Sequence, residues 1–432
     1  MNTVLILHYH EIWLKGGNKK YFLSRLVSAI KQSLADLPVS GPQYISERLI
    51  LRLSEEIALS PVLERLRRVF GLAYIALARE APRDMEAIGA IACEKMAAKN
   101  PHNFAVRAKI ADTSFELNSM ELEKALGRKI LDHLRAQGRT VQVNLNEPHV
   151  TCWVEVIPGK AMVYTDRVAG AGGLPAVTSG RLIVLLSGGF DSSVAAYKMM
   201  RRGAHAVFVH FFGPPGEERG SSLPIAEAIV RTLTPYQFTS RLYLVPFDSI
   251  QRQIVATAHE SFRLLLYRRM MARIAREIAK AEKALGLVTG DSVSQVASQT
   301  LHNLAAVDRG LDFPIYRPLA GDDKSEILRI AHEIGTYKIS CEPFEDCCPR
   351  FMPRSPEIFA RPKQLEDAES CLAVEALVTE GLESATALDF TFVQGKIECR
   401  EAHLPRLQKL IGWRKAALPV PSETPAGGRG SS

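Results

Sequence analysis

The first 80 residues alternate between apolar runs of strand length and amphipathic segments. Apolar runs at 3–9 and 47–53 predict strands, and residues 20–37 between them carry apolar side chains at helical spacing. A second helix at 61–69 and a strand at 71–80 continue this order. Alternating elements of this size are typical of a small α+β sandwich.

Residues 85–166 predict a further α+β unit. The pattern indicates helices at 85–99 and from about Ser119, where Ser-Met-Glu-Leu resembles a capping sequence, and strands at 104–110, 140–145 and 151–165. Five basic residues gather here, namely Arg107, Lys109, Lys124, Arg128 and Lys129. Their charge alone favours a solvated basic face.

The pattern changes at residue 181, after a Gly-, Ala- and Pro-rich stretch that predicts a linker. Near-continuous apolar runs now alternate with helical stretches, as in a parallel sheet that is covered on both faces. These runs lie at 181–186, 206–212, 241–247 and 284–290, and the longest helix is expected at 258–284. Later, a helical stretch (365–380) and a strand-like piece (388–399) precede an end at 419–432 that we expect to be disordered.

Composition places the chain among ordinary globular proteins of several domains. It has 432 residues, of which 47% are hydrophobic and 23% charged. No stretch approaches the about 18–20 apolar residues of a membrane-spanning helix. The first apolar run is also too short for a secretory signal. We therefore expect a cytoplasmic protein whose seven cysteines are reduced thiols.

The net charge of +7 is unevenly distributed. Residues 1–180 hold 23 basic and 18 acidic side chains, residues 181–360 hold 22 and 19, and the remainder hold 9 and 10. The surplus in the first two thirds would attract a polyanion, although so mild a surplus is also typical of an ordinary surface.

The strongest local signal is LIVLLSGGFDSSVAAYKMMRRG at 182–203. A buried strand is followed by the turn Ser187-Gly188-Gly189, and a helix then begins near Asp191. Glycines let the backbone approach a ligand, and a helix N-terminus offers N–H groups to an anion. The turn lacks the lysine of phosphoryl-transfer loops, so it is better suited to a pyrophosphate that leaves as a unit. Asp191 is a candidate Mg²⁺ ligand or, alternatively, a helix cap.

Ser187–Ser192 resembles the S-G-G-x-D-S signature of the PP-loop ATP pyrophosphatases, which transfer AMP to a substrate oxygen and release pyrophosphate. More of the chain, about residues 1–350, resembles one family among them, the tRNA 4-thiouridine synthetases or tRNA sulfurtransferases. The likeness rests on the segments 10–22, 104–123, 163–180, 286–304, 314–327 and 342–348.

The resemblance implies a multidomain α/β and α+β protein. Its expected parts are a ferredoxin-like domain (1–60), a THUMP tRNA-binding domain (61–166), a linker (167–180), a PP-loop domain with a doubly wound parallel sheet (181–360) and a C-terminal extension (361–432). It also implies an ATP- and Mg²⁺-dependent enzyme that adenylates the uridine at tRNA position eight and replaces its O4 with persulfide sulfur. The five basic residues then become candidate tRNA contacts.

The family's ATP site is carried over position by position. It would use the loop residues Ser187, Gly188, Gly189 and Ser192, the strand ends at Leu185, Leu186, His210 and Phe211, and in addition Arg268, Gly290 and Gln299. Strand ends that line a crevice are where an open α/β sheet binds its ligand. Without the resemblance, Arg268 and Gln299 would be interpreted as helix-surface residues.

Lys324 matches a family lysine and is a candidate for neutralising charge as pyrophosphate departs. The alternative is a salt bridge to Asp322 or Asp323.

The cysteines decide the sulfur step. Cys347 aligns with the family cysteine that carries sulfur chemistry, and Cys348 and Cys341 are candidate resolving thiols. Adjacent cysteines fit one tetrahedral metal site poorly, and the chain has no C-x-x-C pair.

Two departures from the family matter. Ser193 stands where a proline is common, and only 72 residues follow Ala360, so we expect no rhodanese relay. A cysteine desulfurase is therefore expected to load Cys347 or Cys348 directly. Sulfur transfer to the carrier protein of the thiamine thiazole and a homodimeric state are secondary hypotheses.

Two rival classes remain open. A small-molecule adenylating synthetase shares the PP-loop but usually brings a glutaminase domain, of which the sequence shows no sign. A non-catalytic tRNA-binding protein would not need the complete loop or Lys324.

Overall fold

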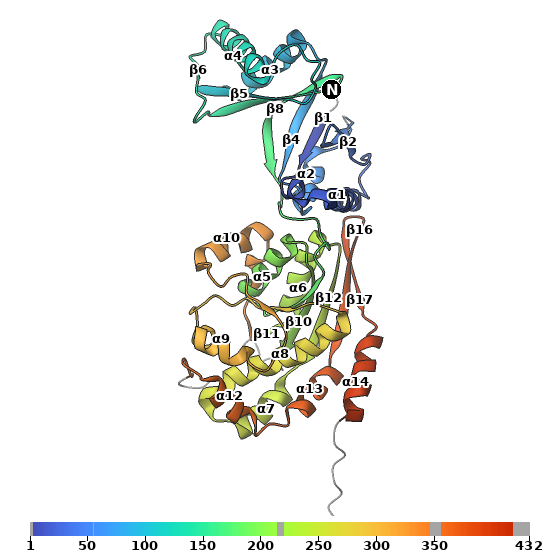
Figure 1. The fold of residues 1–432 in the computed structure, drawn as a ribbon, viewed down its shortest axis with the longest axis vertical. Coiled ribbons are helices and arrows are strands. Elements are labelled where there is room, and N and C mark those ends of the chain that lie inside the picture. The colour runs from blue at the N-terminus through green and yellow to red at the C-terminus, as the bar shows by residue number, and fades with distance from the viewer. Residues whose placement is uncertain (1–2, 55, 214–219, 346–355, 418–432) are drawn as a thin grey trace, which may run out of the picture. The chain divides into compact units, whose positions relative to one another are not determined.

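The structure, a computed structural model, describes residues 3–54, 56–213, 220–345 and 356–417. The chain divides into two compact units, which are described separately (Figure 1). The first is Met1–Thr178 with two short pieces, Arg201–Gly203 and Gln394–Lys396, and the second is the rest of the chain. The predicted disorder at 419–432 concerns residues outside the described ones.

The first unit is built on one eight-stranded sheet in the order β2-β3-β1-β4-β8-β7-β5-β6. Its strands are β1 (Thr3–His8), β2 (Gln43–Ile45), β3 (Arg48–Leu53), β4 (Tyr74–Ala81), β5 (Asn103–Ile110), β6 (Gln142–Val143), β7 (Val150–Ile157) and β8 (Lys160–Ala169). Strand β4 pairs antiparallel with both β1 and β8. The two parts expected at 1–60 and 61–166 therefore share a single sheet.

The helices of this unit are η1 (Glu11–Asn18), α1 (Lys19–Ser33), α2 (Leu59–Arg67), α3 (Met85–Lys99) and α4 (Ser119–Ala136). Side chains of α3 and α4 form one core with Phe104 and Val106 of β5. The cap of α4 is Asn118 rather than the predicted Ser119. Asn118 accepts the backbone N–H of Glu121, and the Glu121 side chain accepts the N–H of Asn118.

Two strand predictions for this unit are wrong. The single strand expected at 151–165 is a hairpin of β7 and β8, because Gly159 adopts a φ of +82° and turns the chain. The strand expected at 140–145 is reduced to Gln142–Val143. Strand β8 also runs to Ala169, into the predicted linker.

The second unit contains a seven-stranded sheet in the order β14-β13-β9-β10-β12-β16-β17. Its strands are β9 (Arg181–Leu185), β10 (His205–Phe212), β12 (Thr239–Pro246), β13 (Leu287–Val288), β14 (Ile315–Tyr316), β16 (Thr386–Val393) and β17 (Lys396–Glu401). The first five in the sheet order are parallel, and β16 joins β12 antiparallel. The predicted α/β fold with a mostly parallel sheet is confirmed. A separate pair is formed by β11 (Gly220–Ser221) and β15 (Phe344–Glu345).

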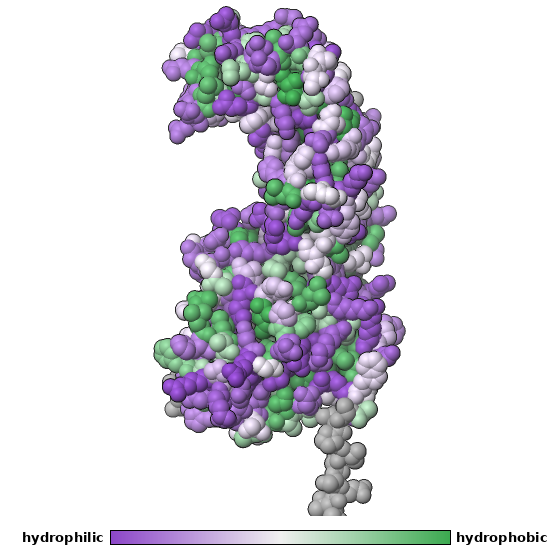
Figure 2. Space-filling view, viewed as in Figure 1, coloured by the Kyte–Doolittle hydropathy of each residue, from purple (hydrophilic) through white to green (hydrophobic). Residues whose placement is uncertain are grey.

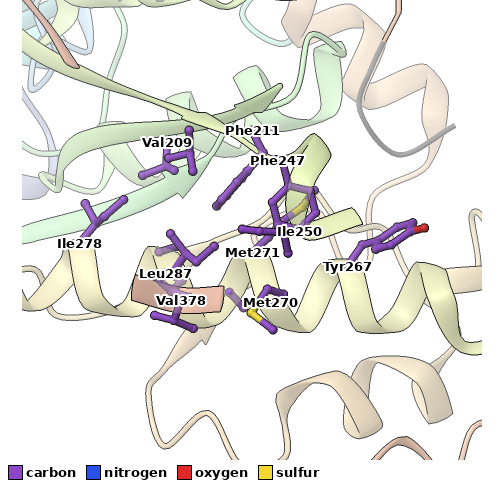
Figure 3. Packing of buried hydrophobic residues seen from close by; sticks show 14 of the residues in the cluster. Val209, Phe211, Phe247, Ile250, Tyr267, Met270, Met271, Ile278, Leu287 and Val378 are labelled. Carbon is purple, nitrogen blue, oxygen red and sulfur yellow. The ribbon is translucent and has the colours of Figure 1, made fainter. Parts of the chain in front are cut away.

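Helices flank this sheet (Figure 1). They are α5 (Phe190–Arg201), α6 (Leu223–Leu233), η2 (Thr234–Tyr236), α7 (Asp248–Thr257), η3 (Glu260–Phe262), α8 (Arg263–Glu282), η4 (Ala297–Gln299), α9 (Leu301–Asp308), α10 (Lys324–Ile334), α11 (Tyr337–Ser340), α12 (Pro362–Glu369), α13 (Val374–Glu383) and α14 (Pro405–Ala417). Helix α8 is the longest of the described helices and starts later than expected, since Ala258 ends α7. Its Met270 and Ile278 pack in one core with Val209 and Leu287 of the sheet (Figure 3).

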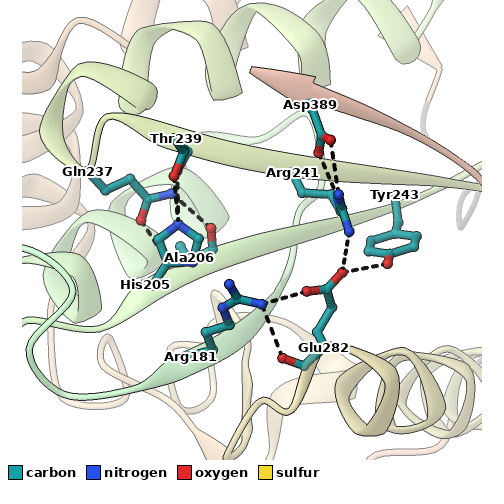
Figure 4. Close-up of polar contacts among 9 residues, drawn as sticks. All are labelled: Arg181, His205, Ala206, Gln237, Thr239, Arg241, Tyr243, Glu282 and Asp389. Atoms are coloured by element: carbon teal, nitrogen blue, oxygen red, sulfur yellow. Dashed lines mark hydrogen bonds and ion pairs between the residues drawn. The ribbon is translucent and has the colours of Figure 1, made fainter. Parts of the chain in front are cut away.

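Charged side chains attach the late strand β16 to the sheet (Figure 4). Arg241 of β12 donates two hydrogen bonds to Asp389 of β16, at 2.7 and 2.9 Å, and one to Glu282 at 2.8 Å. Glu282 also accepts from Arg181 at 2.9 Å and from the Tyr243 hydroxyl at 2.7 Å. The strand-like piece expected at 388–399 is thus a hairpin that extends the sheet.

The face of the molecule in Figure 2 is mostly hydrophilic, and its apolar residues lie in small groups. Within the described ranges, every helix is too short or too polar to cross a membrane.

Candidate functional site

A cavity of about 510 Å³ opens in the second unit where β9, β13 and β14 end. Seven residues predicted for ATP or Mg²⁺ line it: Leu185, Ser187, Asp191, Ser192, Arg268, Gly290 and Gln299. The crevice beyond the carboxyl ends of parallel strands is where an open α/β sheet binds ligands. The sequence-predicted groups, scattered over more than 100 residues, thus meet at one place.

Five predicted ATP residues lie outside the cavity lining: Leu186, Gly188, Gly189, His210 and Phe211. The His210 ring is fully buried, with Nδ1 2.8 Å from the Leu186 carbonyl oxygen and Nε2 2.8 Å from the Ser222 hydroxyl. The Phe211 ring packs edge-on against Phe247, with centroids 5.4 Å apart. Their side chains therefore serve the core, and any contact with ATP would come from the backbone.

The loop after β9 is held in shape by its own serines. The Ser187 backbone N–H donates to the Ser192 hydroxyl at 3.1 Å, and the two hydroxyls are also 3.1 Å apart. Ser193, where the family commonly has proline, bonds the Phe190 carbonyl at 2.9 Å and the Thr336 hydroxyl at 3.0 Å. The helix start is therefore kept without the proline.

Gly290 has a packing role that the sequence did not reveal. A Cβ there would lie 2.7 Å from the Ser192 backbone nitrogen and 2.8 Å from the Asp191 carbonyl carbon. The segment after β13 can approach the loop this closely only with glycine.

Lys324 and Asp191 form an ion pair beside this loop. The Lys324 ammonium lies 2.9 and 3.0 Å from the two Asp191 carboxylate oxygens and 4.3 Å from the Phe190 ring centroid. The alternative interpretation of Lys324 is wrong, because Asp322 pairs with Lys198 and Asp323 caps α10. Asp191 itself lies inside the first turn of α5, which begins at Phe190, so it does not cap that helix.

Asp291, which the sequence pattern did not single out, is only 4% exposed and lies in the wall of the cavity. It accepts hydrogen bonds from Arg268 at 2.6 Å, Thr289 at 2.8 Å, Arg317 at 3.1 Å and Gln299 at 3.2 Å. Burial alone would raise the pKa of Asp291, but Arg268, Thr289 and Arg317 outweigh it and lower the pKa below its ordinary value. Its position just after a parallel strand is the one sequence signal that pointed to it.

The five predicted tRNA contacts fall on two faces of the first sheet. Arg107 and Lys109 alternate along β5 with Val106, which faces α3 and α4, so they lie on the opposite face. The other three are on α4, where Lys124 and Arg128 are exposed and Lys129 pairs with Glu86 at 2.7 Å. The basic cluster is therefore not a single patch.

The sheet face that carries Arg107 and Lys109 also holds stacked aromatic rings and a cavity. The Arg167 guanidinium carbon lies 3.4 Å from the Trp153 ring centroid and 4.5 Å from that of Tyr74. A cavity of about 370 Å³ is lined by His8, Tyr9, Trp13, Arg48 and Lys109, among others. We call this surface the open sheet face. Rings and guanidinium groups of this kind are surfaces on which unpaired bases stack.

Beneath the open sheet face, Glu155 is a buried carboxylate that is 4% exposed. It bonds Arg48, accepts from the Tyr164 hydroxyl at 2.8 Å and lies 3.2 Å from His8. Burial would raise the pKa of Glu155, but His8 and Arg48 lower it to about 2.

The predicted sulfur carriers Cys347 and Cys348 lie outside the described residues. Cys341 is exposed just after α11, where its hydrogen bond raises the pKa of Tyr337. Within the described part of the chain, His, Cys, Asp and Glu nowhere gather in threes to hold a metal ion.

Comparisons with known proteins agree with this architecture. The family models "ThiI ferredoxin-like domain", "THUMP domain" and "Thiamine biosynthesis protein (ThiI)" match residues 4–76, 83–166 and 177–374. These three parts define a PP-loop protein with a THUMP module.

Close relatives narrow the class. Proteins named "Probable tRNA sulfurtransferase" from Thermus thermophilus and Moorella thermoacetica are 40% and 37% identical to this chain. The matches cover 91% and 90% of this chain and 95% and 98% of those proteins. A crystal structure of a 4-thiouridine synthetase–RNA complex with bound ATP matches with a TM-score of 0.76 and 32% identity, over 90% of this chain and 99% of that one. The chain belongs to the ThiI family of tRNA sulfurtransferases.

Proposed function

We propose that this protein uses ATP to convert the uridine at tRNA position eight into 4-thiouridine, releasing AMP and pyrophosphate. The observation that carries the proposal is the cavity after β9, where Ser187–Ser192 and the Lys324–Asp191 pair come together. A relative that is 32% identical was solved with RNA and ATP bound, which supports the same pair of substrates here.

The first step is adenylation of the uracil. O4 would attack the α-phosphorus of ATP, and the bond to pyrophosphate would break. The backbone N–H groups of the Ser187–Ser192 loop and of the start of α5 would bind the departing group. Arg268, Gly290 and Gln299 line the same cavity and would complete the nucleotide site.

Asp191 fits the role of a Mg²⁺ ligand. Mg²⁺ is usually bound in such sites by one or two carboxylates together with substrate phosphates, and it supplies charge neutralisation there. Both Asp191 oxygens now contact Lys324, so nucleotide binding must rearrange that ion pair. The ammonium of Lys324 would then turn to the pyrophosphate oxygens as their charge grows.

The second step is sulfur transfer. A persulfide on Cys347, or on Cys348, would attack C4 of the activated uracil, and AMP would leave with the former O4. Cys341 or the other member of the Cys347–Cys348 pair would resolve the remaining sulfur–sulfur bond. We assign the persulfide supply to a cysteine desulfurase and keep delivery to the thiamine sulfur carrier, a cytoplasmic location and a homodimer as secondary proposals.

We assign tRNA binding to the first unit. The open sheet face offers Arg107 and Lys109 for phosphates and the Trp153 and Tyr74 rings for unpaired bases. The α4 residues Lys124, Arg128 and Lys129 remain candidate phosphate contacts at a second surface. A small-molecule synthetase would have no use for such a unit, so that rival is not favoured.

The test is mass spectrometry of tRNA nucleosides after incubation of the full chain with tRNA, ATP, Mg²⁺ and a sulfide or persulfide source. We expect 4-thiouridine that depends on ATP, together with AMP and pyrophosphate in equal amounts. With the persulfide donor, Cys347→Ser should abolish the product, and Cys348→Ser and Cys341→Ser, tested beside it, identify the resolving thiol. Unchanged 4-thiouridine in Cys347→Ser would rule out its assigned role.

A further inference from the structure

Four hydrogen-bond donors from separate elements converge on Asp291. Arg268 of α8 and Gln299 of η4 both donate to Oδ1, at 2.6 and 3.2 Å. Thr289, just after β13, and Arg317, just after β14, both donate to Oδ2, at 2.8 and 3.1 Å. One buried side chain is therefore hydrogen-bonded to four residues that line the cavity and lie on different segments of the chain.

Two of these donors are residues already proposed to bind ATP, and Asp291 fixes the direction of each. The Arg268 guanidinium is held between Asp291 and the Ser298 hydroxyl, which it reaches at 3.0 Å. A carboxylate only accepts, so the amide nitrogen of Gln299 must face Asp291. The amide oxygen of Gln299 is then left without a partner among the described residues, as an acceptor for a donor group of the nucleotide.

We propose that Asp291 is a positioning residue for ATP, which holds the Arg268 guanidinium and the Gln299 amide in the orientation that the nucleotide requires. It makes no bond to the reacting atoms. The inference rests on the proposed function, because it takes the cavity to be the ATP site. Partners that orient metal ligands commonly change affinity or activity by about 10- to 100-fold when they are removed, and we expect an effect of this order for a residue that orients contacts to ATP.

Positioning and simple electrostatics predict opposite results. ATP is a polyanion, and a carboxylate in the wall of its cavity repels it. If Asp291 acted only through its charge, the neutral variant Asp291→Asn would bind ATP more tightly. If Asp291 orients Arg268 and Gln299, the same variant binds ATP more weakly, since an amide offers one acceptor and adds a donor that faces their N–H groups.

Asp308 provides a matched control. It binds Arg317 through two hydrogen bonds, at 2.6 and 2.7 Å, but it does not line the cavity. Asp308→Asn therefore removes a more exposed ion pair near the site and leaves the contacts of Arg268 and Gln299 in place.

The experiment measures ATP binding to the full chain by calorimetry, with Mg²⁺ and without tRNA, in the wild type and both variants. We expect Asp291→Asn to raise the Kd about tenfold or more and Asp308→Asn to change it by about twofold at most. In the reaction with tRNA, Asp291→Asn should raise the KM for ATP more than it lowers kcat. Thermal unfolding of both variants shows how much of each effect is general destabilisation.

Unchanged or tighter binding by Asp291→Asn would overturn the inference, and so would an equal loss in both variants. A wild-type chain that fails to bind ATP would overturn the proposed function instead. If Asp291→Asn does not fold, Thr289→Val decides, because it removes one donor to Asp291 and keeps the charge. It must weaken ATP binding by about twofold to fivefold more than Asp308→Asn does, or the inference fails.

Discussion

Glu155 in the first unit and Asp291 in the second are both carboxylates that are 4% exposed and held by cationic side chains. The partners of Glu155, namely His8, Arg48 and Tyr164, lie on strands of one sheet. Those of Asp291 come from α8, from η4 and from the chain beyond two short strands. A buried carboxylate thus reinforces a fold where its partners belong to the same sheet, as on β1, β3 and β8, and shapes a ligand site where it joins separate helices and strand ends.

If the proposed function is correct, the cavity of the second unit catalyses the release of pyrophosphate from ATP. The variant Asp191→Asn tests this and has the largest expected effect. The variant should lower kcat for pyrophosphate release by about 100-fold or more, because metal binding and the contact with Lys324 are both weakened. tRNA affinity should stay the same. Radiolabelled ATP turnover and filter binding of tRNA measure the two quantities.

Asp323→Asn is the matched control for this variant. Asp323 caps α10 next to Lys324, and asparagine caps helices equally well, so turnover should stay within about twofold. An equal loss of turnover in both variants would contradict the role given to Asp191.

The variant Glu155→Gln tests the role of the buried carboxylate in the first unit. It should lower the free energy of unfolding of the first unit by about 3 kcal/mol, since it leaves Arg48 buried without its carboxylate. The Kd for ATP should not change. Denaturant unfolding measures the first quantity, and Glu80→Gln, which breaks half-exposed pairs with Arg52 and Lys160, should cost less than about 1 kcal/mol.

The same variant predicts a pH dependence. The pKa of Glu155 is lowered from 4.5 to about 2 in the folded protein, so its contribution is complete above pH 4.5 and is lost as the pH falls toward 2. The stability difference between the wild type and Glu155→Gln should therefore shrink over that range. A constant difference down to pH 2 would show that charge is not what stabilises Glu155.

The smallest expected effect concerns the open sheet face. The double variant Arg107→Ala, Lys109→Ala should weaken tRNA binding about tenfold and make the affinity less dependent on salt, because phosphate contacts are lost. Lys124→Ala with Arg128→Ala should have less effect, since α4 lies on the other side of the sheet. If the α4 double variant weakens tRNA binding more than the β5 double variant does, tRNA binds the helical side of the sheet instead.

The part of the site that the residue pattern itself predicted is contiguous in the chain, whereas Arg268, Gly290 and Gln299 were predicted only through the family resemblance. Ser187–Ser192 is a strand, a turn and a helix start in one short stretch, so its geometry follows from local preferences. Asp291 was missed because its role depends on Arg268 and Arg317, which are 23 and 26 residues away from it. The alternative given for Lys324, a salt bridge to Asp322 or Asp323, was wrong for the same reason, since Asp191 is 133 residues away and Asp323 is adjacent.

The fold shows the same difference between features set by nearby residues and features set by residues far apart in the sequence. Periodicity predicted four of the five parallel strands and the helical stretches between them, because those elements bury continuous apolar runs. It missed β14, which is only two residues long. Strand β16 carries a more mixed pattern, with burial that varies along it, and it pairs antiparallel with β12, where Arg241 and Asp389 also form an ion pair. A pairing across 148 residues has no local signature.

The continuous sheet of the first unit has a consequence for how that unit opens. Strand β4 forms backbone hydrogen bonds with β1 along one edge and with β8 along the other. Separating β1 from β8 would therefore break the hydrogen bonds along one edge of β4. Regions joined in this way open cooperatively in hydrogen exchange. The amides of β1 and β8 should therefore exchange as one cooperative unit, so the two halves of the sheet would not open independently.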